Sequence, residues 1–216
     1  SRVTRFLEKP SWNEVTTNMI NAGTYVLEPE VLAHIPPQAN FSFERQLFPL
    51  LLDLGEPIYA YPSSAYWIDI GTPEKYLQLH RDLLSGKGNA SRHGFTTGDE
   101  VLIGDQSYIH PTAQIRGPVV IGNNCTIGRN VKLIGPVVIG SGCTIGEDTV
   151  IEECIIWRNA QLGQRVSLKK SIVADDCCLN DNSTIQDSIL GDNVTVVSGG
   201  KLEPGSKIWP GQQYPK

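Results

Sequence analysis

An aliphatic residue returns at every sixth position through the second half of the chain, and this spacing constrains the fold more than any other feature. After Ile151 three of the intervals shorten to five residues. A six-residue aliphatic repeat is typical of a parallel β-helix, in which three short strands form one triangular coil. We therefore predict about six stacked coils over residues 101–216. The series is Ile103, Ile109, Ile115, Ile121, Ile127, Leu133, Ile139, Ile145, Ile151, Ile156, Leu162, Leu168, Val173, Leu179, Ile185, Leu190, Val196, Leu202 and Ile208.

A second column of residues supports this register. The residue four positions after the first aliphatic of each coil is small or of moderate size. A narrow triangular interior at protein packing density has room for one large side chain only if its neighbour is small. The column contains three of the five cysteines, which we expect to be buried and unreactive. Its members are Ser107, Cys125, Cys143, Ala160, Cys177 and Val194.

Composition excludes several classes of protein. The 216 residues carry a net charge of -5, with Lys and Arg scattered, so we expect no nucleic-acid partner. No apolar run approaches the roughly 20 residues of a membrane helix, and no leader is recognisable, so we expect no membrane association and a cytoplasmic location. The cysteines lack the CxxC spacing of a zinc site and are interpreted as reduced. The chain opens without Met in a strand-like segment, so we expect a fragment.

The first 84 residues mix both kinds of secondary structure. Alternation predicts strands over residues 2–7 and 21–27, and two more between residues 58 and 70. Amphipathic spacing predicts a helix from Ser42 to Gly55, kinked at Pro49, and a second helix over residues 73–84 capped by Thr72. Residues 85–100 have neither period and are interpreted as a linker. The predicted domains are therefore an α/β portion (1–84), a linker (85–100) and a β-helix (101–216).

Four segments occur in a characteristic order: FLEKP, NAGTYVLEPEVL, FSFERQLFP and YWIDIGTPEKYL, followed by repeats such as IGNNCTIGRNV. This ordered set resembles the sugar-1-phosphate nucleotidyltransferases of the mannose-1-phosphate guanylyltransferase type, over nearly the whole chain. The resemblance implies the C-terminal part of a Rossmann-like nucleotidyltransferase domain followed by a left-handed β-helix. The left hand comes from the resemblance only, because parallel β crossovers are right-handed in most proteins.

The resemblance also implies a reaction and its residues. A sugar 1-phosphate would attack the α-phosphorus of a nucleoside triphosphate and release pyrophosphate, assisted by Mg²⁺. Asp69 of WIDIG would be a metal ligand and catalytic residue. Glu8 and Lys9 would bind the sugar and its phosphate, with Lys9 also catalytic, and Asn21 and Gly23 would contact the sugar. Taken singly, each of these residues also fits a turn or a solvated strand end.

Other features of the family are absent from these 216 residues, namely its glycine-rich phosphate loop, its catalytic lysine and its first metal-binding aspartate. We therefore expect the chain alone to be inactive, and the nucleobase and sugar stay open. We expect a homo-oligomer formed through the β-helix. Two alternatives stay open: a β-helix acyltransferase with His110 as its base, and a non-catalytic regulatory or assembly subunit. Glu44 lies in the third segment, but near a helix start where an acid is favoured regardless of function, so it is not assigned to the site.

Overall fold

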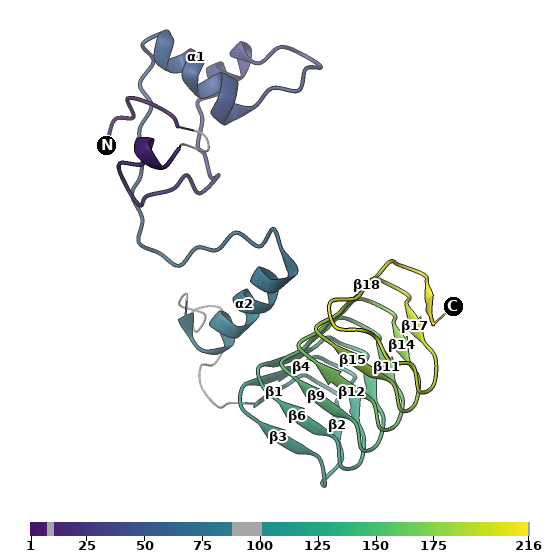
Figure 1. Ribbon diagram of the computed structural model, residues 1–216. Coiled ribbons are helices and arrows are strands. Elements are labelled where there is room, and N and C mark those ends of the chain that lie inside the picture. Colours follow the sequence, from purple (N-terminus) through teal and green to yellow (C-terminus); the bar gives the residue numbers. More distant parts are fainter. Residues whose placement is uncertain (8–10, 88–100, 216) are drawn as a thin grey trace. The chain divides into compact units, whose positions relative to one another are not determined.

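The chain divides into two compact units in the computed structural model, which describes residues 1–7, 11–87 and 101–215 (Figure 1). The units are Ser1–Trp67 and Ile68–Lys216. The second unit contains the helix α2 (Pro73–Leu84) as well as all the β-strands. In this division α2 falls with the β-helix, although the sequence alone groups it with the α/β portion. Among the described residues, no helix has both the length and the apolar character needed to cross a membrane.

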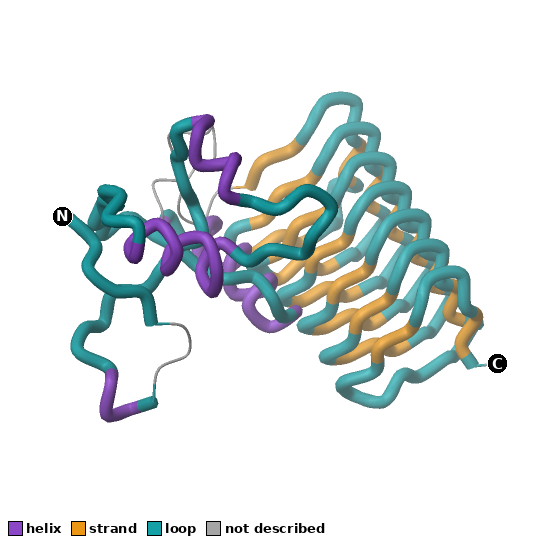
Figure 2. Tube along the Cα trace, turned by 90° about the horizontal axis from the view of Figure 1, so that it is seen from above, coloured by secondary structure: helices purple, strands orange, loops and turns teal. Residues whose placement is uncertain are grey.

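The second unit is a parallel β-helix whose coils stack in one row, as Figure 2 shows. Three parallel sheets form its sides. The first contains β1 (Val101–Ile103), β4 (Val119–Ile121), β7 (Val137–Ile139), β10 (Ile155–Ile156), β13 (Ile172–Val173), β16 (Ile189–Leu190) and β18 (Lys207–Ile208). The second contains β2 (Tyr108–Ile109), β5 (Thr126–Ile127), β8 (Thr144–Ile145), β11 (Gln161–Leu162), β14 (Cys178–Leu179), β17 (Thr195–Val196) and β19 (Gln213–Tyr214). The third contains β3 (Gln114–Arg116), β6 (Lys132–Ile134), β9 (Val150–Glu152), β12 (Ser167–Lys169) and β15 (Thr184–Gln186).

The six-residue aliphatic series forms the interior of this prism, as predicted. Every member from Ile121 to Leu202 is buried, whereas Ile103 is 51% exposed, because β1 is the end strand of its sheet. Strand pairing places equivalent residues of successive coils side by side, for example Ile109 next to Ile127 and Ile127 next to Ile145. Each coil therefore buries its aliphatic corners against the next, which is how a solenoid obtains a continuous core.

The column of residues four positions after the first aliphatic of each coil also faces the interior. The expectation that Cys125, Cys143 and Cys177 are buried is therefore confirmed. The thiol of Cys143 donates to the carbonyl oxygen of Trp157 at 3.0 Å, and that of Cys177 to Gly191 at 3.1 Å. Burial raises the pKa of Cys143 to about 12 and that of Cys177 to about 11. The reactive thiolate is therefore disfavoured at both positions.

The shortened intervals have a local cause at one corner of the triangle. In the earlier coils this corner is a Gly-Pro pair, such as Gly117–Pro118. In the later coils this corner is one residue shorter, and a single residue with positive φ makes the turn. These residues are Glu153, Lys170 and Asp187, with φ of 52°, 46° and 45°. A single residue in the left-handed region makes a tighter turn, so these coils close with 17 residues instead of 18 while the strands stay in register.

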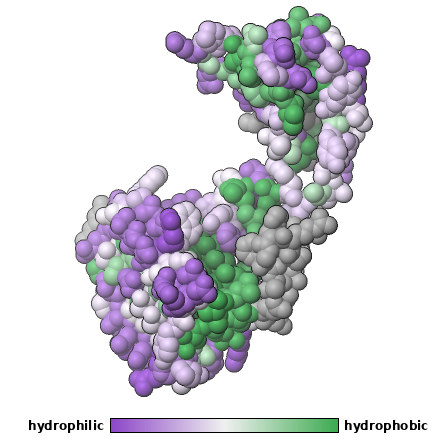
Figure 3. Space-filling view, turned by 180° about the vertical axis from the view of Figure 1, so that it is seen from behind, coloured by the Kyte–Doolittle hydropathy of each residue, from purple (hydrophilic) through white to green (hydrophobic). Residues whose placement is uncertain are grey.

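The outer face of the first sheet is more apolar than the outer face of the second sheet. Successive strands of the second sheet expose Tyr108, Thr126, Thr144 and Gln161, most of which are polar. The equivalent outward row of the first sheet is aliphatic, and Figure 3 shows apolar side chains gathered on one face of this unit. Such a row predicts that another element covers the sheet. The row contains Leu102, Val120, Val138, Ile155, Ile172 and Ile189.

The first unit contains α1 (Phe48–Asp53) and three other helical segments: the 3-10 helices η1 (Trp12–Glu14) and η2 (Pro29–His34), and the π-helical η3 (Phe43–Leu47). Leu47, Phe48 and Leu51 form its buried core. The helix predicted from Ser42 to Gly55 is therefore two segments. Pro49 has no N–H to donate into the first turn of α1, so the α-helical pattern is interrupted there and the chain uses wider π-type bonds just before it.

The predictions of strands over residues 2–7 and 21–27, and of two more between residues 58 and 70, are wrong, because the described residues form no regular strand there. Among the described residues, pairing is limited to an isolated bridge between Arg2 and Tyr59. Around it Val3 N donates to Ile58 O, Ala60 N donates to Ser1 O, and the Ser1 amino group donates to Ala60 O. Alternation detects an extended segment with one buried face, but a strand also needs a neighbour to complete its hydrogen bonds.

Candidate active site

A turn at Asn21 and Gly23 forms the first part of the candidate site. The side-chain Oδ1 of Asn21 accepts a hydrogen bond from the Gly23 backbone N–H at 3.0 Å. Gly23 has a φ of +70°, and no atom lies within 4 Å of where a Cβ would be. This backbone conformation therefore favours glycine, and the space beside it is open.

Two residues that were not assigned to the site from the sequence join this turn. Asn21 Nδ2 donates to the Tyr25 hydroxyl at 2.5 Å, and that hydroxyl donates to Glu44 Oε1 at 2.6 Å. The Ser42 hydroxyl donates to the other carboxylate oxygen of Glu44 at 3.2 Å. The Tyr25 hydrogen bond, with smaller contributions from the Glu44 N–H and Ser42, lowers the pKa of Glu44. The network therefore connects the ionised Glu44 carboxylate to the Asn21 side chain through the Tyr25 hydroxyl.

The sequence contains no periodic signal for Tyr25. Gly23, with a φ of +70°, interrupts the extended backbone between Asn21 and Tyr25, so the alternation of a strand does not apply across this turn. Glu44 lies at the start of η3, where Ser42 caps the helix by accepting the Arg45 N–H. The helix-start interpretation of Glu44 is thus compatible with a second role, because its carboxylate also reaches Tyr25 in a distant segment.

Asp69 lies in the second unit, in the segment that leads into α2. Its Oδ1 accepts a hydrogen bond from the Gly71 N–H at 3.1 Å, and its Oδ2 lies 3.6 Å from Lys75 Nζ. The carboxylate side chain is 62% exposed. Thr72 caps α2 by accepting the Lys75 N–H at 3.4 Å, as predicted. Asp69 is therefore a turn residue in geometry, and its carboxylate also remains accessible to a cation.

The structure brings Asn21 and Gly23 together, but it places them in a different unit from Asp69. Glu8 and Lys9 lie outside the described residues. In the described part of the chain, no group of three or more His, Cys, Asp or Glu side chains is arranged to hold a metal ion. A hard cation such as Mg²⁺ prefers carboxylate oxygens and keeps several waters, so the exposed Asp69 carboxylate fits the part of one ligand only.

The seam between α2 and the β-helix contains a groove of about 250 Å³. Its lining includes Tyr76 and His80 from α2, and Trp157 and Arg158 from a corner of the β-helix. The rings of Tyr76 and His80 meet edge to face, and burial lowers the pKa of His80. Arg158 is paired with Asp175 at 2.6 Å, so its charge is already neutralised within the groove.

Three family models match the chain. The nucleotidyl transferase model matches residues 1–86, the bacterial transferase hexapeptide model matches residues 100–135, and the left-handed β-helix (LbH) domain of the EIF2B epsilon subunit matches residues 133–212. The left hand that the resemblance implied therefore agrees with the matched domain type.

Full-length relatives connect these regions in one protein. The mannose-1-phosphate guanyltransferase of Schizosaccharomyces pombe is 33% identical over 214 residues, covering 96% of this chain and 54% of the relative. This chain is related to the sugar-1-phosphate nucleotidyltransferases. A mannose-1-phosphate guanylyltransferase of Mycobacterium tuberculosis is 38% identical over 55% of this chain and 33% of the relative. A UTP–glucose-1-phosphate uridylyltransferase of Synechocystis is 33% identical over 83% of the chain and 47% of the relative.

The chain spans about half the length of the relatives that it matches over most of its own residues. The family resemblance stated from FLEKP, NAGTYVLEPEVL, FSFERQLFP and YWIDIGTPEKYL is therefore confirmed, including the order of a nucleotidyl transferase segment before hexapeptide repeats. His110, the acyltransferase candidate, has its ring Nδ1 3.0 Å from the Thr112 hydroxyl and receives the Thr112 N–H at 3.2 Å. Those contacts are local to a β-helix corner.

Proposed function

We propose that this chain is the sugar-phosphate-binding part of an enzyme that transfers a nucleotidyl group to a sugar 1-phosphate and releases pyrophosphate. The observation that carries the proposal is the 33% identity to a mannose-1-phosphate guanyltransferase over 96% of the chain. That match extends through both the nucleotidyl transferase segment and the β-helix. The reacting oxygen belongs to the sugar phosphate, and the bond that breaks joins the α- and β-phosphates of the nucleotide.

Asn21 is suited to bind sugar hydroxyls. A carboxamide offers two N–H donors and two acceptor lone pairs, and the contacts of this side chain use one of each, with Tyr25 and Gly23. Its remaining donor and lone pair can meet a hydroxyl that both donates and accepts. Gly23 leaves the space beside it open, and the Glu44 carboxylate, fixed by Tyr25 and Ser42, would accept from a second hydroxyl.

Glu8 and Lys9 complete the sugar-phosphate site in this proposal. A lysine ammonium is a compact positive charge suited to a phosphate, and a glutamate carboxylate accepts from sugar hydroxyls. Asp69 would hold Mg²⁺, which neutralises crowded phosphate oxygens in phosphoryl-type transfer. A second carboxylate and the phosphate-binding loop would come from residues outside the 216 of this chain.

The β-helix is proposed as an oligomerisation platform, and the protein as a cytoplasmic enzyme with no nucleic-acid partner. The interior of the β-helix is filled by side chains, and four of the five thiols are buried. The match to the EIF2B epsilon domain favours one second candidate, a non-catalytic assembly subunit. That candidate would keep the β-helix and would not need the sugar-phosphate residues.

A substrate panel separates these two functions. Full-length polypeptide carrying this sequence would be incubated with Mg²⁺, each of mannose and glucose 1-phosphate, and each of GTP, UTP, dTTP and ATP, and pyrophosphate release would be measured. We expect turnover with one pair, and none by the isolated 216-residue chain. Turnover by the isolated chain would contradict the division of the site, and inactivity of the full-length protein with every pair would favour the assembly subunit.

A further inference from the structure

Asp69 is held by groups at the start of α2. One carboxylate oxygen accepts the Gly71 N–H at 3.1 Å, and the other faces Lys75 Nζ at 3.6 Å, with Lys75 in the first turn of the helix. Thr72 fixes that turn by capping it. Any movement of the N-terminal end of α2 therefore moves or reorients the Asp69 carboxylate.

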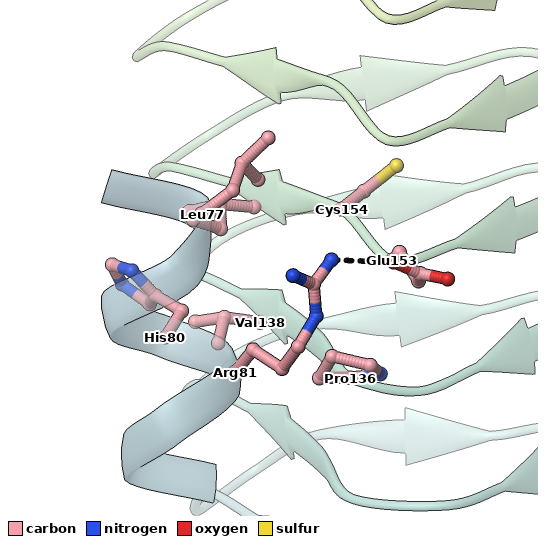
Figure 4. Close-up of a pocket in the computed structure, with 8 residues that line it drawn as sticks. Leu77, His80, Arg81, Pro136, Val138, Glu153 and Cys154 are labelled. Carbon is pink, nitrogen blue, oxygen red and sulfur yellow. Dashed lines mark hydrogen bonds and ion pairs between the residues drawn. The ribbon is translucent and has the colours of Figure 1, made fainter. Parts of the chain in front are cut away.

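The helix itself is packed on the aliphatic outer row of the first sheet. Ile155 and Ile172 point away from the interior, yet they are only 3% and 7% exposed. Leu77 and Arg81 lie against Val138 and Ile155 in one small cavity (Figure 4). This packing accounts for the aliphatic residues at Val138 and Ile155 of the outward row.

An ion pair fixes the position of α2 along the β-helix. Arg81 Nη2 lies 2.7 Å from Glu153 Oε2 (Figure 4). Glu153 is one of the three residues that turn the shortened corner alone, with a φ of 52°, so its side chain projects from a tightly turned backbone. At the other end of the helix, hydrogen bonds from the Glu74 N–H and the Thr72 hydroxyl, with a smaller effect of Lys207 in the last coil, lower the pKa of Glu74. The helix residues Leu77 and His80 lie beside Val138 and Ile155, which belong to neighbouring coils.

We propose that the β-helix positions the metal-binding carboxylate of Asp69 through α2, with Lys75 and the Arg81–Glu153 pair as positioning residues. This inference rests on the proposed role of Asp69. It gives the β-helix a task beyond oligomerisation, because α2 and the coils belong to one compact unit that excludes residues 1–67.

The distance from Arg81 to the N-terminal end of α2 is large enough for a small tilt of the helix to displace Asp69. Arg81 follows Pro73 by eight residues, or about 12 Å along a helix that rises 1.5 Å per residue. A tilt of about 5° around Arg81 would shift the N-terminal turn by about 1 Å. A displacement of about 1 Å in a reacting geometry can reduce the rate by about a hundredfold. A small change in helix seating is therefore sufficient to affect the metal ligand.

The test uses two variants in the full-length protein. Arg81→Glu places two carboxylates in opposition, and the double variant Arg81→Glu, Glu153→Arg restores an ion pair with reversed sign. We expect Arg81→Glu to raise the Mg²⁺ concentration for half-maximal rate by about threefold or more, with an unchanged KM for the sugar 1-phosphate and an unchanged Tm. The double variant should return the Mg²⁺ requirement close to that of the wild type.

Asp187→Asn is the matched control, since Asp187 occupies the same kind of corner and Asn tolerates positive φ. Hydrogen exchange of the backbone N–H of Gly71 provides a readout that does not depend on activity, and it should be faster in Arg81→Glu only. An unchanged Mg²⁺ requirement and unchanged Gly71 exchange in Arg81→Glu would overturn the inference. If the wild type proves inactive with every substrate, the proposed function fails, and the exchange measurement still decides whether the β-helix positions Asp69.

Discussion

Replacing Ile127 by alanine should destabilise the β-helix by about 2–5 kcal/mol. Ile127 is fully buried and lies between Ile109 and Ile145 of the neighbouring coils. The substitution removes three carbon atoms, worth about 0.8 kcal/mol each in transfer free energy, and leaves a cavity that adds to the cost. The lumen has little freedom to collapse around this cavity, because strand pairing on all three sides fixes the distance between coils.

The assay is urea unfolding of the chain followed by far-ultraviolet circular dichroism. Ile134→Ala is the matched control, because Ile134 directly follows the lumen residue Leu133 in β6, points outward and is 36% exposed. We expect that control to cost less than about 1 kcal/mol. If both substitutions lower the free energy of unfolding equally, the assignment of Ile127 to the lumen is wrong.

Three further predictions follow from single contacts in the structure. A thiol reagent at pH 8 should label the partly exposed Cys178 first and Cys143 only on unfolding, because burial raises the pKa of Cys143 to about 12; rapid labelling of Cys143 would contradict this. Ser183→Ala should leave stability unchanged or raise it, since the buried Ser183 hydroxyl has no hydrogen-bond partner. Ser171→Ala is its control and should cost about 1–3 kcal/mol, because that hydroxyl donates to one backbone carbonyl and accepts one backbone N–H. The first unit should lose stability as pH falls through the lowered pKa of Glu44, since a depressed carboxyl pKa stabilises the fold only above it; the Glu44→Gln variant should show a weaker dependence, because Glu14 of the same unit also has a lowered pKa.

Much of the second unit could be predicted from residue spacing. The six-residue period identifies which aliphatic side chains face inward, because strand geometry and coil length are nearly constant along a solenoid. The cysteine column follows from the same constraint. The helix over residues 73–84 also follows from local signals, since Thr72 accepts the Lys75 N–H as a cap should.

The partners of these elements could not be predicted in the same way. A helical period shows that α2 has an apolar face, but it does not identify the surface on which that face packs. The sequence therefore did not predict that α2 packs on Val138 and Ile155, or that Arg81 pairs with Glu153, 72 positions away. In the first unit, Tyr25 connects Asn21 to Glu44 through side-chain hydrogen bonds, and such contacts have no period in the sequence.

The role of Asp69 as a metal ligand is tested most directly by the Mg²⁺-dependent rate of sugar-nucleotide formation by the Asp69→Asn variant of the full-length protein. Asparagine keeps the shape of the side chain but removes the anionic oxygen that Mg²⁺ prefers. Asp53→Asn, at the exposed end of α1, is the control. We expect Asp69→Asn to lower the rate by about a hundredfold or more, as for other groups that stabilise transition-state charge, and Asp53→Asn to have no effect. A near-normal Mg²⁺-dependent rate in Asp69→Asn would contradict the account.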